Sequence, residues 1–372
     1  MSVTVDPSCV DDEALRSDRR RRLFAAMEDA DLDALVLGRP AEVAFASGAR
    51  QLWTAGSRPF GPAAVAVRST GRVHLLSVSD FDVPPEVAHD DLYGLSWNPA
   101  HLAAALGAIP GLAAARRVGT TSSSPGFPRL LAAISPSAAV VDGRAALWAA
   151  RGPKSAAEVE QIVAATGIAR VALAAMEAAL RPGVSERDLL AAYLAAIASA
   201  GAPTPPSEGV ACATPAQGPV ALRRIARSSP IEAGQLVVLD PGAFFRGYEG
   251  GLGRTRAVGG ATSLHKAELA ARCRAAVGVV VAACWPGTAG SDLLEAWTAT
   301  GEALPAEPLA VGVGLGLEPP VIGRGLGMGS ILVPGTVLAV TGWVAEEGTG
   351  GVLQRDLVMV TGAEPRLLTE DG

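Results

Sequence analysis

The sequence predicts two domains: an N-terminal α/β domain built on one mixed sheet, and a larger C-terminal domain. At 372 residues the chain is long for one domain and comfortable for two. Helical and strand-like patterns alternate up to about residue 150, whereas the later helix-rich segments are each followed by strand-rich ones. We therefore place the domains at residues 1–150 and 151–372.

The N-terminal domain is predicted from short segments of alternating type. Residues 17–30 have helical periodicity, and residues 32–38 form an apolar run typical of a buried strand. Residues 63–69 and 73–79 flank a glycine-containing turn and predict a β-hairpin. The remaining patterns predict helices over 101–106 and 128–134, and strands over 116–122 and 138–143.

The C-terminal domain begins with two predicted helices, residues 155–180 and 184–199. Ser185 and Asp188 have the spacing of a capping box at the start of the second. A third long helix is predicted over 263–284, and a fourth begins at Ser291. Strands are predicted over 234–242, 254–260, 311–320, 335–342 and 351–362.

Composition excludes several classes of function. Apolar residues make up 49% of the chain and the net charge is -6, which is unfavourable for a nucleic-acid partner. Four cysteines without paired spacing predict neither a zinc knuckle nor a disulfide framework, and no phosphate-binding loop or other cofactor motif is found. The first residues, including Cys9, lack an apolar signal core, and the apolar stretch Ala275–Trp285 is too short to span a bilayer. We expect a cytoplasmic protein without cofactor or membrane partner.

Several short motifs together resemble the creatinase/aminopeptidase P family. They are Arg151, Lys154-Ser155 and Glu158 before a helix, residues 182–186 (Pro-Gly-Val-Ser-Glu), and residues 45–48 (Phe-Ala-Ser-Gly). The resemblance covers nearly the whole chain. It implies a creatinase-type N-terminal domain with a mixed sheet, an α+β "pita-bread" C-terminal domain and a homodimer.

The resemblance also locates the positions at which active family members hold two divalent metals with carboxylates and one histidine. Asp240, in an Asp-Pro-Gly turn, matches the first ligand. The other four positions fall on Gly251, Val311, Thr341 and Arg355, of which none is a usual ligand for a hard cation. The resemblance therefore implies a divergent member without a metal site.

A second functional histidine of the family falls on Leu317. No histidine follows His265, so another alignment cannot restore it. Creatinase cleaves C–N bonds without metal, but it uses the histidine at the position of Val311, so that mechanism is not inherited. A buried carboxylate is costly unless paired, and we hypothesise an ion pair between Asp240 and Arg355.

The predicted catalytic residues are Asp240, Glu249 and Arg355, and Glu249 lies two residues from Gly251 on the same strand face. Asp240 has an equally weighted alternative as a turn residue. A glutamate such as Glu249 is more often a solvated strand residue than a base. Trp343 either fills a cavity or forms an aromatic ligand wall, and we favour the wall. The predicted substrate-binding residues are Tyr248, Val311, Leu317, Glu318, Thr341 and Trp343.

These features predict a metal-independent enzyme that is not a metallopeptidase. We expect a cyclase, lyase or hydrolase of specialised metabolism, acting on a small amide, amino-acid or peptide-like substrate through a carboxylate acid or base. The alternative is a catalytically inactive pseudo-peptidase that binds a partner. The third possibility, an Xaa-Pro-type metallopeptidase with unusual ligands, is given least weight.

Overall fold

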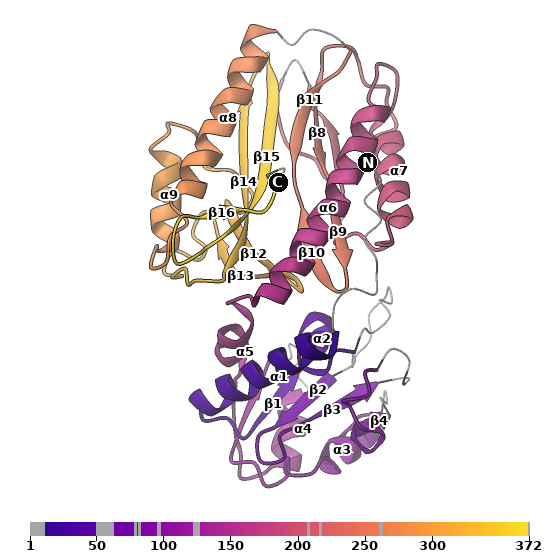
Figure 1. Ribbon diagram of the computed structural model, residues 1–372, viewed down its shortest axis with the longest axis vertical. Helices are drawn as coiled ribbons and strands as arrows, with labels where there is room; N and C mark the ends of the chain where they lie inside the picture. Colours follow the sequence, from indigo (N-terminus) through magenta and orange to yellow (C-terminus); the bar gives the residue numbers. More distant parts are fainter. Residues whose placement is uncertain are drawn as a thin grey trace. The chain divides into compact units, whose positions relative to one another are not determined.

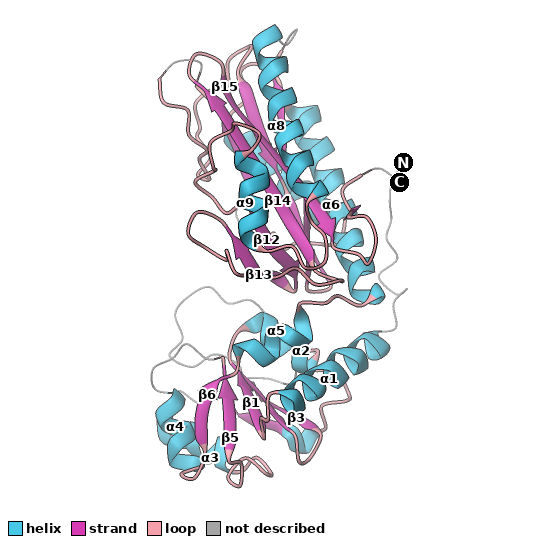
Figure 2. Ribbon diagram, turned by 90° about the vertical axis from the view of Figure 1, so that its left-hand side faces the viewer, coloured by secondary structure: helices cyan, strands magenta, loops and turns pink. Residues whose placement is uncertain are grey.

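A computed structural model describes residues 12–49, 63–77, 80, 83–94, 98–121, 127–206, 209–215, 218–259 and 263–370. The N-terminal residues for which we predict no signal segment, Cys9 among them, lie outside these ranges. The chain divides into two compact units, residues 10–151 and 152–372, each with its own sheets (Figures 1 and 2).

The N-terminal unit holds a six-stranded mixed sheet in the order β4-β3-β2-β1-β5-β6. Its strands are β1 (Ala34–Leu37), β2 (Ala63–Val67), β3 (Arg72–Ser77), β4 (Leu92–Gly94), β5 (Arg117–Thr120) and β6 (Ala139–Asp142). The β2–β3 hairpin predicted from the glycine turn is antiparallel, whereas β1, β5 and β6 run parallel. The predicted mixed sheet is thus confirmed.

Helices surround this sheet. They are α1 (Asp12–Asp29), α2 (Pro40–Ser47), α3 (Pro99–Gly107), α4 (Phe127–Ile134) and α5 (Arg144–Arg151), with the short helix η1 (His89–Asp91). Leu102 and Leu106 of α3 and Leu131 of α4 pack in one core with Val36 and Val65 of the central strands. The apolar faces of short helices therefore cover a sheet whose inner strands are fully buried.

The C-terminal unit contains two helix–sheet layers (Figure 1). The first has α6 (Ala156–Ala179), α7 (Glu186–Ser199), β7 (Val210–Ala213), β8 (Leu236–Asp240), β9 (Gly242–Phe245), β10 (Tyr248–Gly251) and β11 (Arg254–Ala257). The second has α8 (Leu264–Ala282), α9 (Gly290–Thr298), β12 (Ala310–Gly314), β13 (Gly316–Ile322), β14 (Val337–Glu346), β15 (Gly350–Met359) and β16 (Arg366–Leu367). This arrangement confirms the predicted α+β pita-bread fold.

Local sequence explains where the first two of these helices begin. Ser155 and Ser185 each cap a helix, and the residue three positions later bonds back to the serine backbone: Glu158 at 3.0 Å and Asp188 at 2.8 Å. The capping box predicted at Ser185 is therefore confirmed. Among the described residues α6 is long and apolar enough to cross a bilayer by composition alone, but its residues Ala165 and Ala169 lie in the protein core.

Strand order in the C-terminal unit gives the sheets β11-β8-β7, β10-β9 and β13-β12-β14-β15-β16. Helices α6 and α7 pack on the first two sheets. Helices α8 and α9 pack on the five-stranded sheet (Figure 2). A backbone bridge joins the layers: Gly253 donates to the Arg355 carbonyl at 3.1 Å, and Arg355 donates back at 3.0 Å. This bridge fixes the register between the strands that build the site.

Candidate active site

A cavity of about 410 Å³ lies between the two layers of the C-terminal unit. One wall comes from β8, β9 and β10, and the other from β12 to β15. Because strand side chains alternate, one face of β14 packs under α8 while the other, with Ala339 and Thr341, faces the cavity. The volume suits a small ligand.

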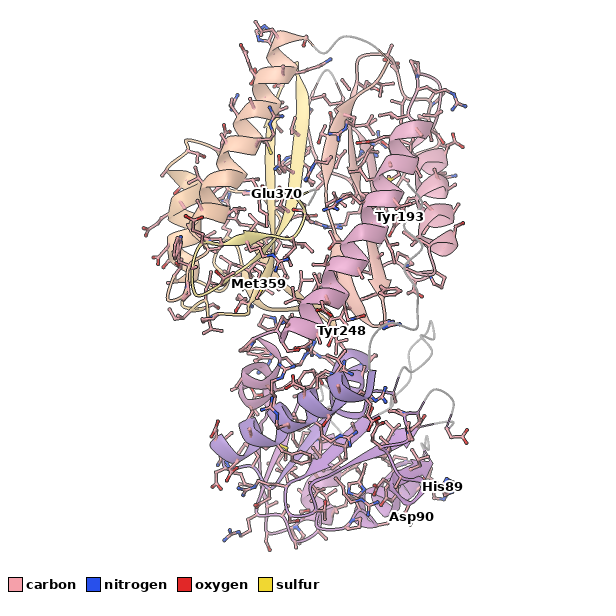
Figure 3. The ribbon with its side chains drawn as sticks, viewed as in Figure 1. His89, Asp90, Tyr193, Tyr248, Met359 and Glu370 are labelled. Atoms are coloured by element: carbon pink, nitrogen blue, oxygen red, sulfur yellow. The ribbon has the colours of Figure 1, made fainter. Side chains whose placement is uncertain are left out.

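Asp240 is the last residue of β8, and the following turn is held from behind by Tyr193. The Tyr193 hydroxyl donates to the Gly242 carbonyl at 2.7 Å. Burial raises the pKa of Tyr193 to about 12, so it stays protonated as a donor. Figure 3 labels both Tyr193, which lies on α7, and Tyr248, which lies on β10. Helix α7 therefore positions the start of β9.

The Asp240–Arg355 ion pair predicted from the sequence is confirmed. Arg355 Nη1 lies 3.0 Å from Asp240 Oδ2, and Arg355 Nε donates to Thr341 Oγ1 at 3.0 Å. The Asp240 side chain is 2% exposed, and its Oδ1 atom has no hydrogen-bond partner among the described residues. Burial raises the pKa of Asp240, and the charge of Arg355 opposes that rise. Half of this carboxylate is thus left unsatisfied, which is unusual for a buried group.

Glu249 reaches the same cavity from β10. The β9–β10 hairpin turns through Arg246 and Gly247, both with positive φ, and β10 presses closely on α6 at Gly250. A Cβ atom at Gly250 would lie 2.2 Å from the Thr166 backbone nitrogen, so only glycine fits there. Glu249, next to this contact, is held at the cavity wall rather than free in solvent.

Burial raises the pKa of Glu249 to about 7. The nearby charge of Arg355 lowers it, and Asp240 and Glu318 raise it further. A carboxyl with this pKa exchanges protons near neutral pH, which its ordinary value of 4.5 would not allow. Glu249 is therefore the group in the cavity best suited to proton transfer.

Three of the predicted substrate-binding residues line the cavity: Val311, Leu317 and Thr341. Gly251, which occupies a metal-ligand position of the family by resemblance, also lines it. Leu317 is 62% exposed although it is apolar. The wall formed by β12 and β13 is thus an apolar surface that a ligand could cover.

The other three predicted substrate-binding residues are engaged elsewhere. The Tyr248 hydroxyl donates to Glu158 Oε1 at 2.9 Å, and Glu318 forms a buried ion pair with Lys154. Trp343 packs beside the buried cluster of Val210, Cys212, Val238 and Leu353, so it forms no aromatic wall at this cavity. Their physical role is to hold α6 and the two sheets in place.

Sequence reasoning missed several residues at the rim, above all Arg224 and Glu307. Their side chains form a bidentate ion pair, in which Arg224 Nε donates to Glu307 Oε1 at 3.0 Å and Arg224 Nη2 donates to Glu307 Oε2 at 2.6 Å. Both residues line the cavity beside Pro206 and Pro308. The only local signal was a cluster of arginines in the loop before β8. Which of them turns toward the cavity depends on the tertiary fold.

Metal donors are sparse around this cavity. Across the parts of the chain that the structure describes, no group of three or more His, Cys, Asp or Glu side chains is placed to hold a metal ion. Asp240 Oδ2 already pairs with the Arg355 guanidinium, which leaves only Oδ1 without a hydrogen-bond partner among the described residues.

Several solved structures with the same fold are peptidases by name. The prolidase from Pyrococcus horikoshii OT3 has a TM-score of 0.78 and 22% identity, covering 95% of this chain and 99% of its own. The dipeptidase PepE from Mycobacterium ulcerans has a TM-score of 0.74 and 23% identity, covering 98% and 97%. The Xaa-Pro dipeptidase from Bacillus anthracis has a TM-score of 0.74 and 19% identity, covering 96% and 98%. Among curated proteins, no sequence matches.

A sequence profile corrects the predicted function. The profile of metallopeptidase family M24 matches residues 160–362, which span both layers and the cavity between them. The expectation of a metal-independent enzyme outside the metallopeptidases, with metallopeptidase activity given least weight, is therefore wrong. That expectation gave decisive weight to four side chains, whereas the match rests on a segment of about two hundred residues. The chain belongs to metallopeptidase family M24.

Proposed function

We propose that this protein is a peptidase whose substrates are short peptides of the Xaa-Pro type, bound in the cavity of the C-terminal unit. The observation that carries the proposal is Glu249, a carboxyl group with a pKa of about 7 on the wall of a ligand-sized cavity. Membership of family M24 supports the reaction class. The names of the similar structures, prolidase and Xaa-Pro dipeptidase, support the substrate class.

The roles of the site residues follow from their surroundings. Glu249 accepts or donates the proton of the reaction, because its pKa permits both protonation states near neutral pH. Arg355, fixed by Asp240 and Thr341, presents its positive charge beside the place where a peptide carbonyl would gain negative charge. Val311 and Leu317 contact the apolar part of the ligand.

We infer that the metal positions of the family have diverged in this chain. Asp240 is paired with arginine, and Gly251, Val311 and Thr341 provide neither a carboxylate nor an imidazole. A cation beside Asp240 would be repelled by the guanidinium. The residues present therefore do not fit a two-metal centre. Metal analysis of the purified protein tests this inference: two bound divalent ions per chain would contradict it.

Hydrolysis of Ala-Pro and Leu-Pro, followed by the release of proline, tests the function. The assay is run with added Mn²⁺, Co²⁺ or Zn²⁺ and with a chelator, so that a metal requirement is measured directly. We expect proline release by the native protein and a loss of about 10²- to 10⁴-fold in Glu249→Gln. Arg272→Met, on the surface of α8, serves as a control for purification and handling.

Two results would overturn the proposal. One is the absence of turnover under every metal condition together with no binding of either dipeptide. The other is turnover that Glu249→Gln leaves unchanged, which would remove the cavity from the reaction.

A homodimer and a cytoplasmic location remain proposals. The first rests on the family resemblance, and the second on the composition of the sequence. Size-exclusion chromatography with light scattering would report the mass in solution, and a single-chain mass would contradict the homodimer.

A further inference from the structure

Two arginines line the cavity, and they differ in how firmly they are held. Arg355 forms an ion pair with the buried Asp240 and donates a hydrogen bond to Thr341. Arg224 is paired with Glu307, and the two side chains are 42% and 33% exposed. An ion pair in contact with water is worth little, about 0–1 kcal/mol at most sites. Arg224 can therefore exchange its carboxylate partner at low cost, whereas Arg355 cannot.

The backbone that carries Arg224 is nevertheless fixed. Its neighbour Arg223 points the other way and donates to Glu186 at 3.2 and 2.6 Å and to the Ala213 carbonyl at 2.9 Å. The backbone nitrogen of Arg227 donates to the same buried glutamate at 2.6 Å. The loop before β8 is thereby tied to α7, so the Arg224 guanidinium is presented from a rigid base.

Glu307 comes from the segment before β12, in the opposite layer. It is followed by Pro308, which lines the cavity together with Pro206. The Arg224–Glu307 pair thus links the two layers at the solvent-exposed rim of the cavity. Its charges reach the interior: Arg224 lowers the pKa of Asp240, and Glu307 raises it.

Charge is arranged along the cavity with a definite polarity. In the interior, Asp240 and Glu249 face one arginine, so this end becomes negative when Glu249 is ionised. A zwitterionic ligand will therefore place its ammonium group inward and its carboxylate outward. At the rim, the two-pronged geometry that Arg224 now offers to Glu307 is also the geometry that recognises a free carboxylate.

We propose that Arg224 receives the free carboxyl terminus of the ligand, and that Glu307 occupies the guanidinium until the ligand replaces it. Arg224 is then a specificity-determining residue that selects short peptides with an unblocked C-terminus. This assignment rests on the proposed peptide site but goes beyond it, because it predicts which peptides are rejected.

Affinity for Ala-Pro and for its C-terminal amide, measured by calorimetry at low salt as the KM of the hydrolysis, tests the assignment. We expect the native protein to bind the acid up to about 5-fold more tightly than the amide, because a water-exposed ion pair contributes at most about 1 kcal/mol. Arg224→Met keeps the apolar part of the side chain. It should lower the affinity for the acid by that factor and leave the affinity for the amide unchanged. Glu307→Gln should retain the preference, since it releases the guanidinium from its competitor.

The control is Arg272→Met. Arg272 forms a surface pair with Glu302 of the same two-pronged form, at 2.8 and 3.0 Å, but it lies on α8 away from the cavity. The Arg272→Met substitution should leave the affinity for both ligands unchanged. A folded-state check by circular dichroism accompanies each variant.

The possible outcomes separate the two proposals. Equal affinity for acid and amide in the native protein overturns the role of Arg224 while the peptide site stands. An equal loss of affinity for the acid and the amide in Arg224→Met has the same meaning, because it shows a structural effect of the substitution. If neither ligand binds the native protein, the peptide site and the role of Arg224 are both overturned.

Discussion

Adjacent residues of β15, Arg355 and Asp356, point to opposite faces of the strand and show two different kinds of polar site. Asp356 is surrounded by donors: Arg254 at 2.8 Å, Thr369 at 2.8 Å and Gln354 at 2.6 Å. Arg355 on the other face meets Asp240, whose second oxygen has no hydrogen-bond partner in the described residues.

The difference between these two carboxylates distinguishes a residue that stabilises the fold from a residue that is available to a ligand. A buried carboxylate with all its donors supplied fixes one conformation, here the junction between β11, β15 and the C-terminal segment. A carboxylate with one unsatisfied oxygen beside a cavity lowers the stability of the protein, and the packing of the fold does not require this cost. Such sites are where ligand binding is expected to supply the missing partner. The predictions below test this distinction, beginning with the largest effect.

Removing the charge of Arg355 should destabilise the protein most. Arg355→Met leaves Asp240 buried without a counter-charge, and we expect a loss of about 3–5 kcal/mol in the free energy of unfolding at pH 8. The loss should shrink at lower pH, because Asp240 can then take up a proton. Urea unfolding at pH 8 and pH 5 measures both values. Adding Asp240→Asn to this variant should restore much of the stability, and no recovery would show that the ion pair is not the cause.

Glu249 should make stability depend on pH. Because burial raises its pKa from 4.5 to about 7, the folded state holds its proton longer than the unfolded state does. Stability should therefore fall as pH rises from 4.5 through 7, by about 3 kcal/mol in total. Glu249→Gln should lack this decrease. If the free energy of unfolding changed with pH in the same way in both proteins between pH 4.5 and 8, the raised pKa would be contradicted.

Asp356→Asn should cost about 1.5–3 kcal/mol, because Arg254 loses its charged partner. The affinity for Ala-Pro should stay unchanged, in contrast to variants on the cavity face of β15. Chemical denaturation and calorimetry on the same preparation provide the two readings. A large loss of ligand affinity would end the distinction between the two faces of the strand.

Tyr193→Phe should have the smallest effect, about 1 kcal/mol. The ring stays packed, and only the hydrogen bond from its hydroxyl to Gly242 is lost. Thermal unfolding measures the change. A drop as large as that of Arg355→Met would mean that the turn after β8 depends on this one bond.

Much of the site could be anticipated from the sequence, since Asp240, Glu249, Arg355, Val311, Leu317 and Thr341 were each selected and line the same cavity. Tyr248, Glu318 and Trp343 were selected from the same strands but face the core or buried partners. Strand alternation gives the relative direction of neighbouring side chains, but it does not say which face of a strand meets the cavity.

The enzyme class was misjudged for a related reason. Each substituted metal-ligand position, considered alone, argues against a metallopeptidase. The match to family M24 depends instead on the whole pattern of both layers. A few changed side chains in a cavity alter its chemistry without altering the packing that defines the family.

By itself, the sequence determined the elements of this protein: helices that begin at Ser155 and Ser185, strands with alternating faces, and the β2–β3 hairpin at a glycine turn. These features depend on neighbours within a few residues, so a local pattern encodes them. Only the tertiary structure decided that Arg224 would meet Glu307 at the rim and that Glu249 would titrate near pH 7. Both depend on burial and on charges from distant segments, which meet only when the two layers of the C-terminal unit pack together.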